Sequence, residues 1–531
     1  MDELKSDLTI QDSERVIRRA EGTHDLLIKN ARIVPATHAG DNIDKTWSIL
    51  CQDGRVARIE PFSSDPNSGP GELGSSATTT GSTVVSPKQS GVHEVDAKGG
   101  LLIPSFCHAH IHLDKCFILD QCGELLTGDF HEAMHLTKSA KSTFPSRASD
   151  LYARGARLIR ESVEYGVTSM RAFVEVDEEV GFACLDVGLR LKEEFKSVCE
   201  VQIAVFAQEA LFSSVESAEP GPNFRLLKEA AGRAGVSVIG SAPYVEPSVD
   251  HAKRNIRLVF DIVDTLRVRE GHLTEAPRSL EVDFHLDYNL DPGSEPLIYE
   301  VIKLIKERYY GVPDSRDTRS EDVSPAAAPA NNVIHGCPRI TVGHATRLQM
   351  FSSDEWVSLL SSIASTGPPI PITFVALPQS DIYMQGRAHM DEPLGAPRGT
   401  LRVPFLKAKY GVDVAMSVNN VDNAFTPQGS LDPLSLCSFG VALFQSAREE
   451  DLRTLLRSVT LTARRAIGSM GIDTDQVPSA DLAPSISDRA DLVILHGRES
   501  VRSAVLNPPF DRTTIKGGKV VALRRSTAWV A

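Results

Sequence analysis

The sequence lacks any long uninterrupted run of apolar residues, although apolar residues make up 41% of it. No stretch approaches the roughly 20 residues that a membrane-spanning helix requires, so we expect no transmembrane segment. The amino-terminal stretch MDELKSDLTIQDSERVIRR is polar and acidic at its start, which is not typical of a secretory signal. We therefore expect a globular protein without a membrane partner.

Positive charge is also scarce, because 56 lysines and arginines face 70 aspartates and glutamates, for a net charge of -14. Such an acidic balance argues against nucleic acid or an anionic membrane as the main partner. Eight cysteines are present, but no two of them form a CxxC pair. This pattern is typical of reduced, mostly structural thiols and indicates a cytoplasmic protein.

The most informative stretch is GGLLIPSFCHAHIHLDKCF at residues 99–117, which places His108, His110 and His112 at alternate positions. Alternate residues of an extended strand face the same side, so these imidazoles converge and two of them can reach one metal ion. Neutral imidazole is the commonest metal-binding side chain. An isolated pair of this kind can also be polar edge residues. We expect His108 to pack beneath the site.

With 531 residues, the chain is too long for one compact core. Residues 1–24 are expected to form an amino-terminal tail. Residues 25–104 are strand-like, with QDGR as a hairpin turn, and contain a Ser- and Gly-rich segment at 63–91 that we expect to be flexible. Residues 485–531 contain the strand-like runs RADLVILHG, SVRSAVLNPP and DRTTIKGGKVVALRR. We predict that the two ends pair into one small β-sandwich.

Between these ends, over residues 105–484, strand-like runs alternate with amphipathic helical segments. After the histidine strand the runs are VTSMRAFVEV, EVQIAVFAQ, VSVIGSA, LEVDFHLD, RITVGHA, PITFVAL and VDVAMSV. Eight such units predict an α/β fold, a (β/α)8 barrel of the TIM type, whose active site lies at the carboxyl ends of the strands. The Pro- and Ala-rich residues 311–332 are expected to be an insertion between the fifth and sixth units.

Polar residues cluster where this barrel would place an active site. They are Gln208 and Glu209 after the third strand, His285, Asp287 and Tyr288 after the fifth, His344 after the sixth, and Asn419 and Asn420 after the eighth. A lone histidine is more often structural, and Glu209 could cap a helix. Histidines from three strand ends that meet at one rim favour a metal-binding site.

These motifs resemble the amidohydrolase superfamily of metal-dependent hydrolases, and most closely its cytosine deaminase and N-isopropylammelide amidohydrolase branch. The resemblance covers nearly the whole chain and is carried by GGLLIPSFCHAHIHLDK, VQIAVFAQEAL, FHLDYN, VGHAT, MQGR and IKGGKVVA. It implies one divalent metal ion, zinc or iron, bound by His110, His112 and His285. It also implies that His344 assists water activation and holds the substrate carbonyl, while Gln208 hydrogen-bonds a ring.

Three positions depart from the pattern of the cytosine deaminases. Tyr288 stands in place of an acidic residue, and Phe173 in place of a histidine after the second strand. Asn419 aligns with an aspartate that takes a proton, and asparagine can offer a weak carbonyl ligand but no carboxylate base. Asp422 lies three residues further on and is an alternative base. We expect Tyr288 to orient the ring together with Gln208.

The sequence therefore predicts a metal-dependent hydrolase that acts on a C–N bond of a small heterocyclic amine or amide. A bound metal would polarise the bond and lower the pKa of water, with His344 and Asn419 as the catalytic residues. The alternative is a catalytically impaired barrel that binds a small molecule or a partner, because Asn419 is not a carboxylate. A homo-oligomer is compatible with the sequence, which does not determine the oligomeric state.

Overall fold

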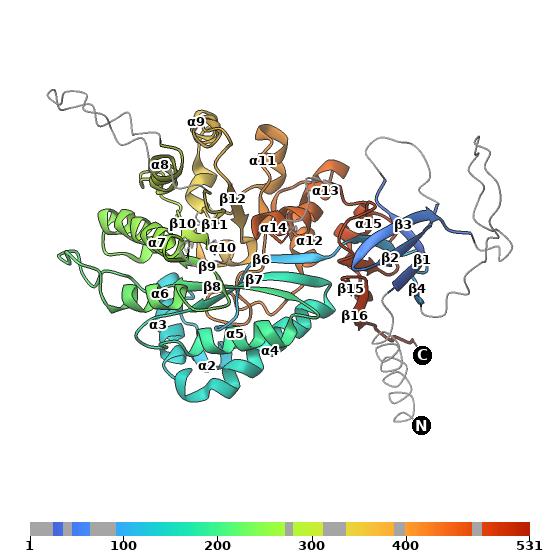
Figure 1. Cartoon of the computed structure of the whole chain (residues 1–531), viewed down its shortest axis with the longest axis horizontal. Coiled ribbons are helices and arrows are strands. Elements are labelled where there is room, and N and C mark those ends of the chain that lie inside the picture. Colours follow the sequence, from blue (N-terminus) through green and yellow to red (C-terminus); the bar gives the residue numbers. More distant parts are fainter. Residues whose placement is uncertain are drawn as a thin grey trace. The chain divides into compact units, whose positions relative to one another are not determined.

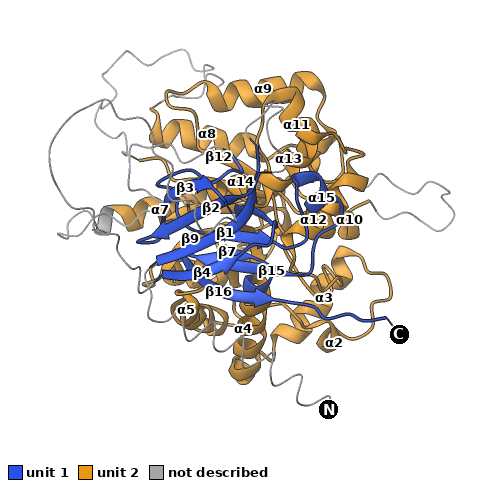
Figure 2. Cartoon of the chain, turned by 90° about the vertical axis from the view of Figure 1, so that its right-hand side faces the viewer, with its two compact units in different colours: residues 1–105, 163–168, 474–531 blue, residues 106–162, 169–473 orange. Residues whose placement is uncertain are grey.

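A computed structural model describes residues 25–35, 45–63, 92–270, 280–311, 336–386, 399–469 and 481–530. The chain forms two compact units (Figure 2), namely unit 1 with Met1–Ser105, Val163–Thr168 and Thr474–Ala531, and unit 2 with Phe106–Ser162 and Ser169–Asp473. The predicted tail at 1–24, and the predicted insertions at 63–91 and 311–332 apart from their first residues, lie outside the described residues. Within those ranges, no helix is both long and apolar enough to cross a membrane.

Unit 1 contains one sheet built from both ends of the chain. Its strands are β1 (Asp25–Ile33), β2 (Trp47–Gln52), β3 (Arg55–Pro61), β4 (Val92–Asp96), β5 (Leu101–Pro104), β14 (Leu492–Leu495), β15 (Arg512–Lys516) and β16 (Lys519–Arg524). They follow the order β16-β15-β14-β5-β1-β2-β3, with β4 on β1. The first part of β1 pairs with β2 and β4, whereas Arg32 and Ile33 pair with β5.

The two parts of this sheet share one apolar cluster. Leu26 and Ile28 of β1 pack there with Ile494 of β14 and Ile515 of β15, all almost fully buried. Alternate residues of a strand face the same side, which is why the period-2 pattern of these segments buries one face of the sheet. The two chain ends were predicted to pair into one small β-sandwich. Their pairing is confirmed, and the described strands form one sheet.

One predicted strand in unit 1 is wrong, because part of the run SVRSAVLNPP forms the helix α15 (Val501–Leu506). The Ser500 hydroxyl accepts a hydrogen bond from the backbone N–H of Ser503, and the Ser503 side chain bonds back to the Ser500 backbone. This reciprocal capping satisfies backbone groups at the first helical turn. Val501, Ala504 and Val505 are buried at helical spacing, which the strand prediction overlooked.

Unit 2 is a barrel of eight parallel strands (Figure 1). They are β6 (Phe106–His112), β7 (Val167–Glu175), β8 (Glu200–Ala207), β9 (Val236–Ser241), β10 (Glu281–Leu286), β11 (Ile340–His344), β12 (Ile372–Ala376) and β13 (Ala415–Met416). The strands neighbour one another in chain order, and a parallel bridge between Ile111 and Asn419 closes the ring. The predicted (β/α)8 fold is confirmed.

Helices connect the strands of the barrel and surround them in Figure 1. They are α2 (Leu119–Cys122), α3 (Phe130–Lys141), α4 (Ala148–Glu164), α5 (Ala183–Phe195), α6 (Pro222–Ala231), α7 (Val249–Glu270), α8 (Ile298–Tyr309), α9 (Ser353–Ala364), α10 (Pro378–Met384), α11 (Val403–Tyr410), α12 (Pro433–Leu443), α13 (Glu449–Ser458) and α14 (Leu461–Ala466), with 3-10 turns at η1 (Pro145–Arg147), η2 (Pro243–Val245) and η3 (Thr346–Met350). Leu191 and Phe195 of α5 are buried, as expected for the apolar stripe of an amphipathic helix.

A charged network fills the barrel interior. The fully buried Arg171 of β7 donates from Nη1 to Asp283 Oδ2 at 2.8 Å, and its Nη2 forms an ion pair with Glu281. The same guanidinium donates to Gln202 and Thr341 side-chain oxygens. A buried charge is tolerated only when it is paired and hydrogen-bonded, so this network holds β7 against β8, β10 and β11.

A glycine that lies against the neighbouring strand of the barrel yields a stability prediction. A Cβ atom at Gly240 of β9 would lie 2.2 Å from the backbone oxygen of Asp283 on β10. Because neither backbone can retreat, Gly240→Ala should lower the free energy of unfolding by about 3 kcal/mol, measured by urea unfolding. The control is Gly429, where an added Cβ would meet no atom of the described residues within 4 Å, so Gly429→Ala should change stability by less than about 0.5 kcal/mol. Equal stability of both variants would contradict the prediction.

Candidate active site

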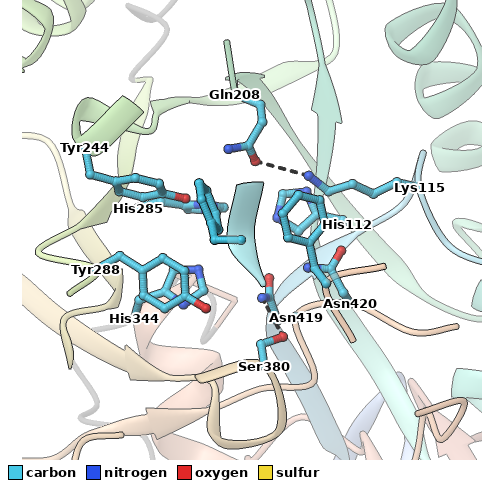
Figure 3. A pocket seen from close by; sticks show the side chains of 12 residues that line it. His112, Lys115, Gln208, Tyr244, His285, Tyr288, His344, Ser380, Asn419 and Asn420 are labelled. Atoms are coloured by element: carbon cyan, nitrogen blue, oxygen red, sulfur yellow. Dashed lines mark hydrogen bonds between the residues drawn. The ribbon is translucent and has the colours of Figure 1, made fainter. Parts of the chain in front are cut away.

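A pocket lies at the carboxyl ends of the barrel strands (Figure 3). It is lined by His112, Lys115, Phe130, Gln208, Tyr244, His285, Tyr288, His344, Ser380, Asn419, Asn420 and Phe425. These residues come from several different strand ends and from the loops and helices that follow them. The pocket is therefore at the rim where a (β/α)8 barrel carries its active site.

The structure brings together the three histidines expected to bind a metal. The candidate ligand atoms of His110, His112 and His285 all lie within 4.8 Å of one another. Both ring nitrogens of His110, Nδ1 of His112 and Nε2 of His285 are buried and have no hydrogen-bond partner among the described residues. Buried polar atoms are rarely left unsatisfied, so this cluster fits a divalent metal ion.

The protonation state of these histidines also suits a metal. Burial, reinforced by neighbouring positive groups, holds the pKa of His110, His112 and His285 well below the ordinary value of histidine. The three rings are therefore neutral at pH 7 and keep the lone pairs that metal ligation requires. An oxygen of Asp283 lies 4.0 Å from Nδ1 of His110, so the interior charge network reaches the cluster.

Two phenylalanines pack against the histidine rings. The Phe173 ring lies 4.2 Å from the His110 ring and 5.1 Å from the His112 ring, measured between centroids. The Phe206 ring lies 4.1 Å from that of His285. Phe173 thus supplies packing and no ligand, and it lowers the local polarity around the cluster.

His344 stands at the end of β11 with a backbone φ of 66°, a conformation that is sparsely populated for residues other than glycine and often marks functional sites. Its Nδ1 lies 2.8 Å from Oδ1 of Asp381 on α10. The other oxygen of Asp381 accepts hydrogen bonds from the Leu377 N–H and the Thr400 hydroxyl. Burial raises the pKa of Asp381, while these bonds oppose that rise. The Tyr288 ring lies 3.8 Å from the His344 ring.

Asn419 also has a positive φ, 67°. Its amide nitrogen donates to Ser380 Oγ at 2.8 Å, and Ser380 is in turn hydrogen-bonded to Thr426. The amide oxygen is buried and has no partner among the described residues, and Figure 3 shows it on the pocket side of the group. The alternative base Asp422 is not among the residues that line the pocket.

Gln208 is oriented by a buried lysine. Lys115 Nζ donates to Glu175 Oε1 at 2.6 Å and to Gln208 Oε1 at 3.1 Å. Burial opposes ionisation of Glu175, but Lys115 and Lys141 hold the pKa of its carboxyl at about 2. Because the Gln208 oxygen is occupied, its amide nitrogen points away from Lys115 in Figure 3 and has no partner among the described residues. Gln208 therefore presents a hydrogen-bond donor to the pocket.

An aromatic wall completes the pocket, and sequence reasoning missed most of it. Besides the expected Tyr288, it contains Tyr244, Phe130 and Phe425, with ring centroids 5.5 to 5.9 Å apart between Tyr244 and Tyr288, Phe130 and Tyr244, and Phe130 and Phe425. Tyr244 lies just after the fourth strand, a position that could have revealed it. Phe130 and Phe425 lie on a helix and a loop with no comparable signal.

Other polar residues after the strands have structural partners. His108 Nε2 lies 3.3 Å from Ser162 Oγ and outside the pocket. Asp287 accepts two backbone N–H groups at the start of α8. Glu209 forms an ion pair with Lys141 at 3.6 Å, and no helix-capping contact of Glu209 is observed in the described chain.

Comparison with known proteins agrees with this geometry, although no family model matches the chain. The pterin deaminase of Rhizobium rhizogenes is 24% identical over 442 residues, which are 81% of this chain and 82% of that protein. The N-isopropylammelide isopropyl amidohydrolase of Pseudomonas sp. is 20% identical over 435 residues, covering 81% and 87%. A crystal structure of 5-methylcytosine deaminase from Klebsiella pneumoniae has a TM-score of 0.69 at 21% identity and covers 95% of this chain and 100% of its own.

Over 81% of its length the chain is thus similar to a deaminase and to an amidohydrolase, and the solved structure shows that the fold is shared. This confirms the resemblance that the sequence motifs predicted. The roles of individual residues in the pocket stay predictions.

The histidine cluster can be tested through metal content. Since the three ligand atoms belong to one site, His112→Ala or His285→Ala should reduce the bound divalent metal from about one ion per chain to a small fraction of that, because a site losing one of three ligands binds far more weakly. Elemental analysis of the purified proteins measures it. His135→Ala, at an exposed position of α3, should leave the metal content unchanged. Unaltered metal in both cluster variants would show that the ion binds elsewhere.

Proposed function

We propose that this protein is a metal-dependent hydrolase that cleaves a C–N bond of a small nitrogen heterocycle. The observation that carries the proposal is the cluster of neutral, unpartnered histidines His110, His112 and His285 beside a pocket with polar groups and aromatic walls. The named relatives, which are a pterin deaminase and an N-isopropylammelide isopropyl amidohydrolase, support the choice of a heterocyclic substrate.

In this proposal His110, His112 and His285 hold one divalent ion, and the unpartnered oxygen of Asn419 faces the same region. When bound, such an ion supplies Lewis acidity and lowers the pKa of a water molecule. Three imidazoles suit both zinc and iron, and zinc is the first ion to test because a structural neighbour, an adenosine deaminase from Xanthomonas campestris, contains it.

The remaining pocket residues would bind and orient the substrate. The Gln208 amide N–H would donate to a ring nitrogen or carbonyl, since Lys115 occupies the Gln208 oxygen. The rings of Tyr244 and Tyr288 offer apolar faces suited to a flat heteroaromatic substrate. His344, held by Asp381, is positioned to exchange a proton with the reacting group.

The assay that tests the proposal offers amino-substituted pyrimidines, pteridines and purines and alkylamino-triazines to the zinc- or iron-loaded protein, and measures release of ammonia or amine. Turnover of at least one class, abolished by a chelator and restored by metal, is the expected result. No turnover with a metal-loaded protein across the panel would favour the second candidate, a catalytically impaired barrel that binds a small molecule. The observation behind that candidate is the neutral amide of Asn419 at the pocket.

We also propose a cytoplasmic location. None of the eight cysteines, all of which are described, is in a disulfide, and seven of them are buried. Such thiols persist in reducing compartments, which supports the proposal.

Asn419→Asp separates the two candidates. In a competent enzyme with another proton acceptor, a carboxylate at this position should change kcat by less than about tenfold, because general base catalysis of roughly two to four orders of magnitude is already present. In an impaired barrel it should create activity from an inactive baseline. Steady-state kinetics of wild type and variant, both zinc-loaded, make the measurement. Asn507→Asp, at an exposed residue of unit 1, controls for the added charge.

A further inference from the structure

Hydrolysis requires a group that accepts the proton of the attacking water, and a carboxylate is a common choice for this task. None of the described residues that line the pocket is an aspartate or glutamate. We ask which other group could accept that proton, and the answer rests on the proposed function because it concerns the same reaction.

The nearby carboxylates are engaged elsewhere. Asp283 accepts from Arg171 and Thr341 in the barrel interior, and Asp287 accepts the backbone N–H groups at the start of α8. Glu175 is paired with two lysines. None of these three side chains lines the histidine pocket.

Asp381 differs from them, because it acts on a residue of the pocket. It is fully buried and does not line the pocket itself. Its Oδ1 is 2.8 Å from His344 Nδ1, whereas its Oδ2 accepts from Leu377 N at 3.1 Å and from the Thr400 hydroxyl. Because Oδ2 already accepts two hydrogen bonds, an ionised Asp381 would accept a third at Oδ1, which would place the shared hydrogen on Nδ1 of His344. Nε2 of His344 then carries a lone pair and is the ring nitrogen available to the pocket.

Two consecutive residues of α10, Ser380 and Asp381, orient two different side chains of the pocket. The Ser380 hydroxyl accepts the amide N–H of Asn419, which leaves the amide oxygen of Asn419 on the pocket side, where it can accept hydrogen bonds but cannot take up a proton at neutral pH. Asp381, the next residue, holds His344. One short helix thus orients a neutral acceptor and a basic imidazole.

We propose that Asp381 is a positioning residue that keeps His344 in the Nδ1–H tautomer, and that this His344–Asp381 pair replaces the missing carboxylate at Asn419. As water adds to the ring carbon and the C–O bond forms, Nε2 of His344 takes one proton from the water. As the C–N bond breaks, Nε2 returns that proton to the leaving nitrogen, which departs as ammonia or an amine. The hydroxyl left on the ring carbon passes its remaining proton to the adjacent ring nitrogen and becomes a ring carbonyl. A buried carboxylate that fixes an imidazole tautomer is a known device of hydrolases.

The kinetic test is Asp381→Asn, which keeps the shape and removes the charge. The zinc-loaded variant should lose about two to four orders of magnitude in kcat, with KM within about threefold of wild type and unchanged metal content, because Asp381 touches neither the proposed ligands nor the pocket. Asp451→Asn makes the same change at a buried carboxylate of α13 that is bonded to Arg448, and it should keep wild-type kinetics. A kcat for Asp381→Asn within threefold of wild type overturns the proposal.

A second readout does not depend on activity. Long-range proton–nitrogen NMR correlation of the full-length, zinc-loaded protein labelled with ¹⁵N-histidine reports the tautomer of each ring, and the signal absent from His344→Gln identifies His344. We expect Nδ1–H in wild type and Nε2–H in Asp381→Asn, where the amide can donate to Nδ1. Nε2–H in the wild type overturns the proposal, even if Asp381→Asn fails to fold.

The two readouts separate this proposal from the proposed function. If no heterocycle in the panel is hydrolysed but wild-type His344 is the Nδ1–H tautomer and changes in Asp381→Asn, the proposed hydrolysis fails while the positioning role of Asp381 is supported. If hydrolysis occurs and the tautomer is Nε2–H, the reverse holds.

Discussion

The candidate active site depends on one backbone junction, the closure of the barrel between its first and last strands. The His112 N–H donates to the Asn419 carbonyl at 2.8 Å, and the Asn419 N–H donates to the His110 carbonyl at 3.1 Å. The Ser417 hydroxyl adds a further bond to the His110 carbonyl at 2.6 Å, across 307 positions of the chain. Because this pairing joins such distant segments, it places Asn419 beside two predicted metal ligands.

Charge is distributed around that junction so that the histidines stay neutral. The Arg171 network in the barrel interior and the Lys115–Glu175 pair beside the pocket are each compensated internally. Burying a charge without a partner would strongly destabilise the fold, and these ion pairs offset that desolvation energy. The pairs also leave positively charged groups near the histidine rings. Burial and those groups together keep imidazole lone pairs available, the state that a metal ligand requires.

In the mechanism that we propose, a carboxylate outside the pocket supports the proton transfer that the neutral amide of Asn419 cannot perform. Function in this fold resides in side chains at the strand ends and in the loops and helices that follow them. A carboxylate on α10 contacts His344 from outside the pocket. The residues proposed for proton transfer therefore lie on other elements than the proposed metal ligands. Rigid orientation by buried hydrogen bonds is what makes such a transfer effective.

The sequence by itself determined the barrel, the pairing of the chain ends and the convergence of His110, His112 and His285. The alternation of residues along each strand is a local pattern, and parallel strands that follow one another around a barrel bring their carboxyl ends to the same rim. It misjudged α15, where capping by Ser500 outweighed a strand-like pattern. Only the tertiary structure decided the partner of His344 and the aromatic wall. Asp381 and Phe425 lie on a helix and a loop whose positions follow from packing over the whole barrel, and no short-range pattern encodes such contacts.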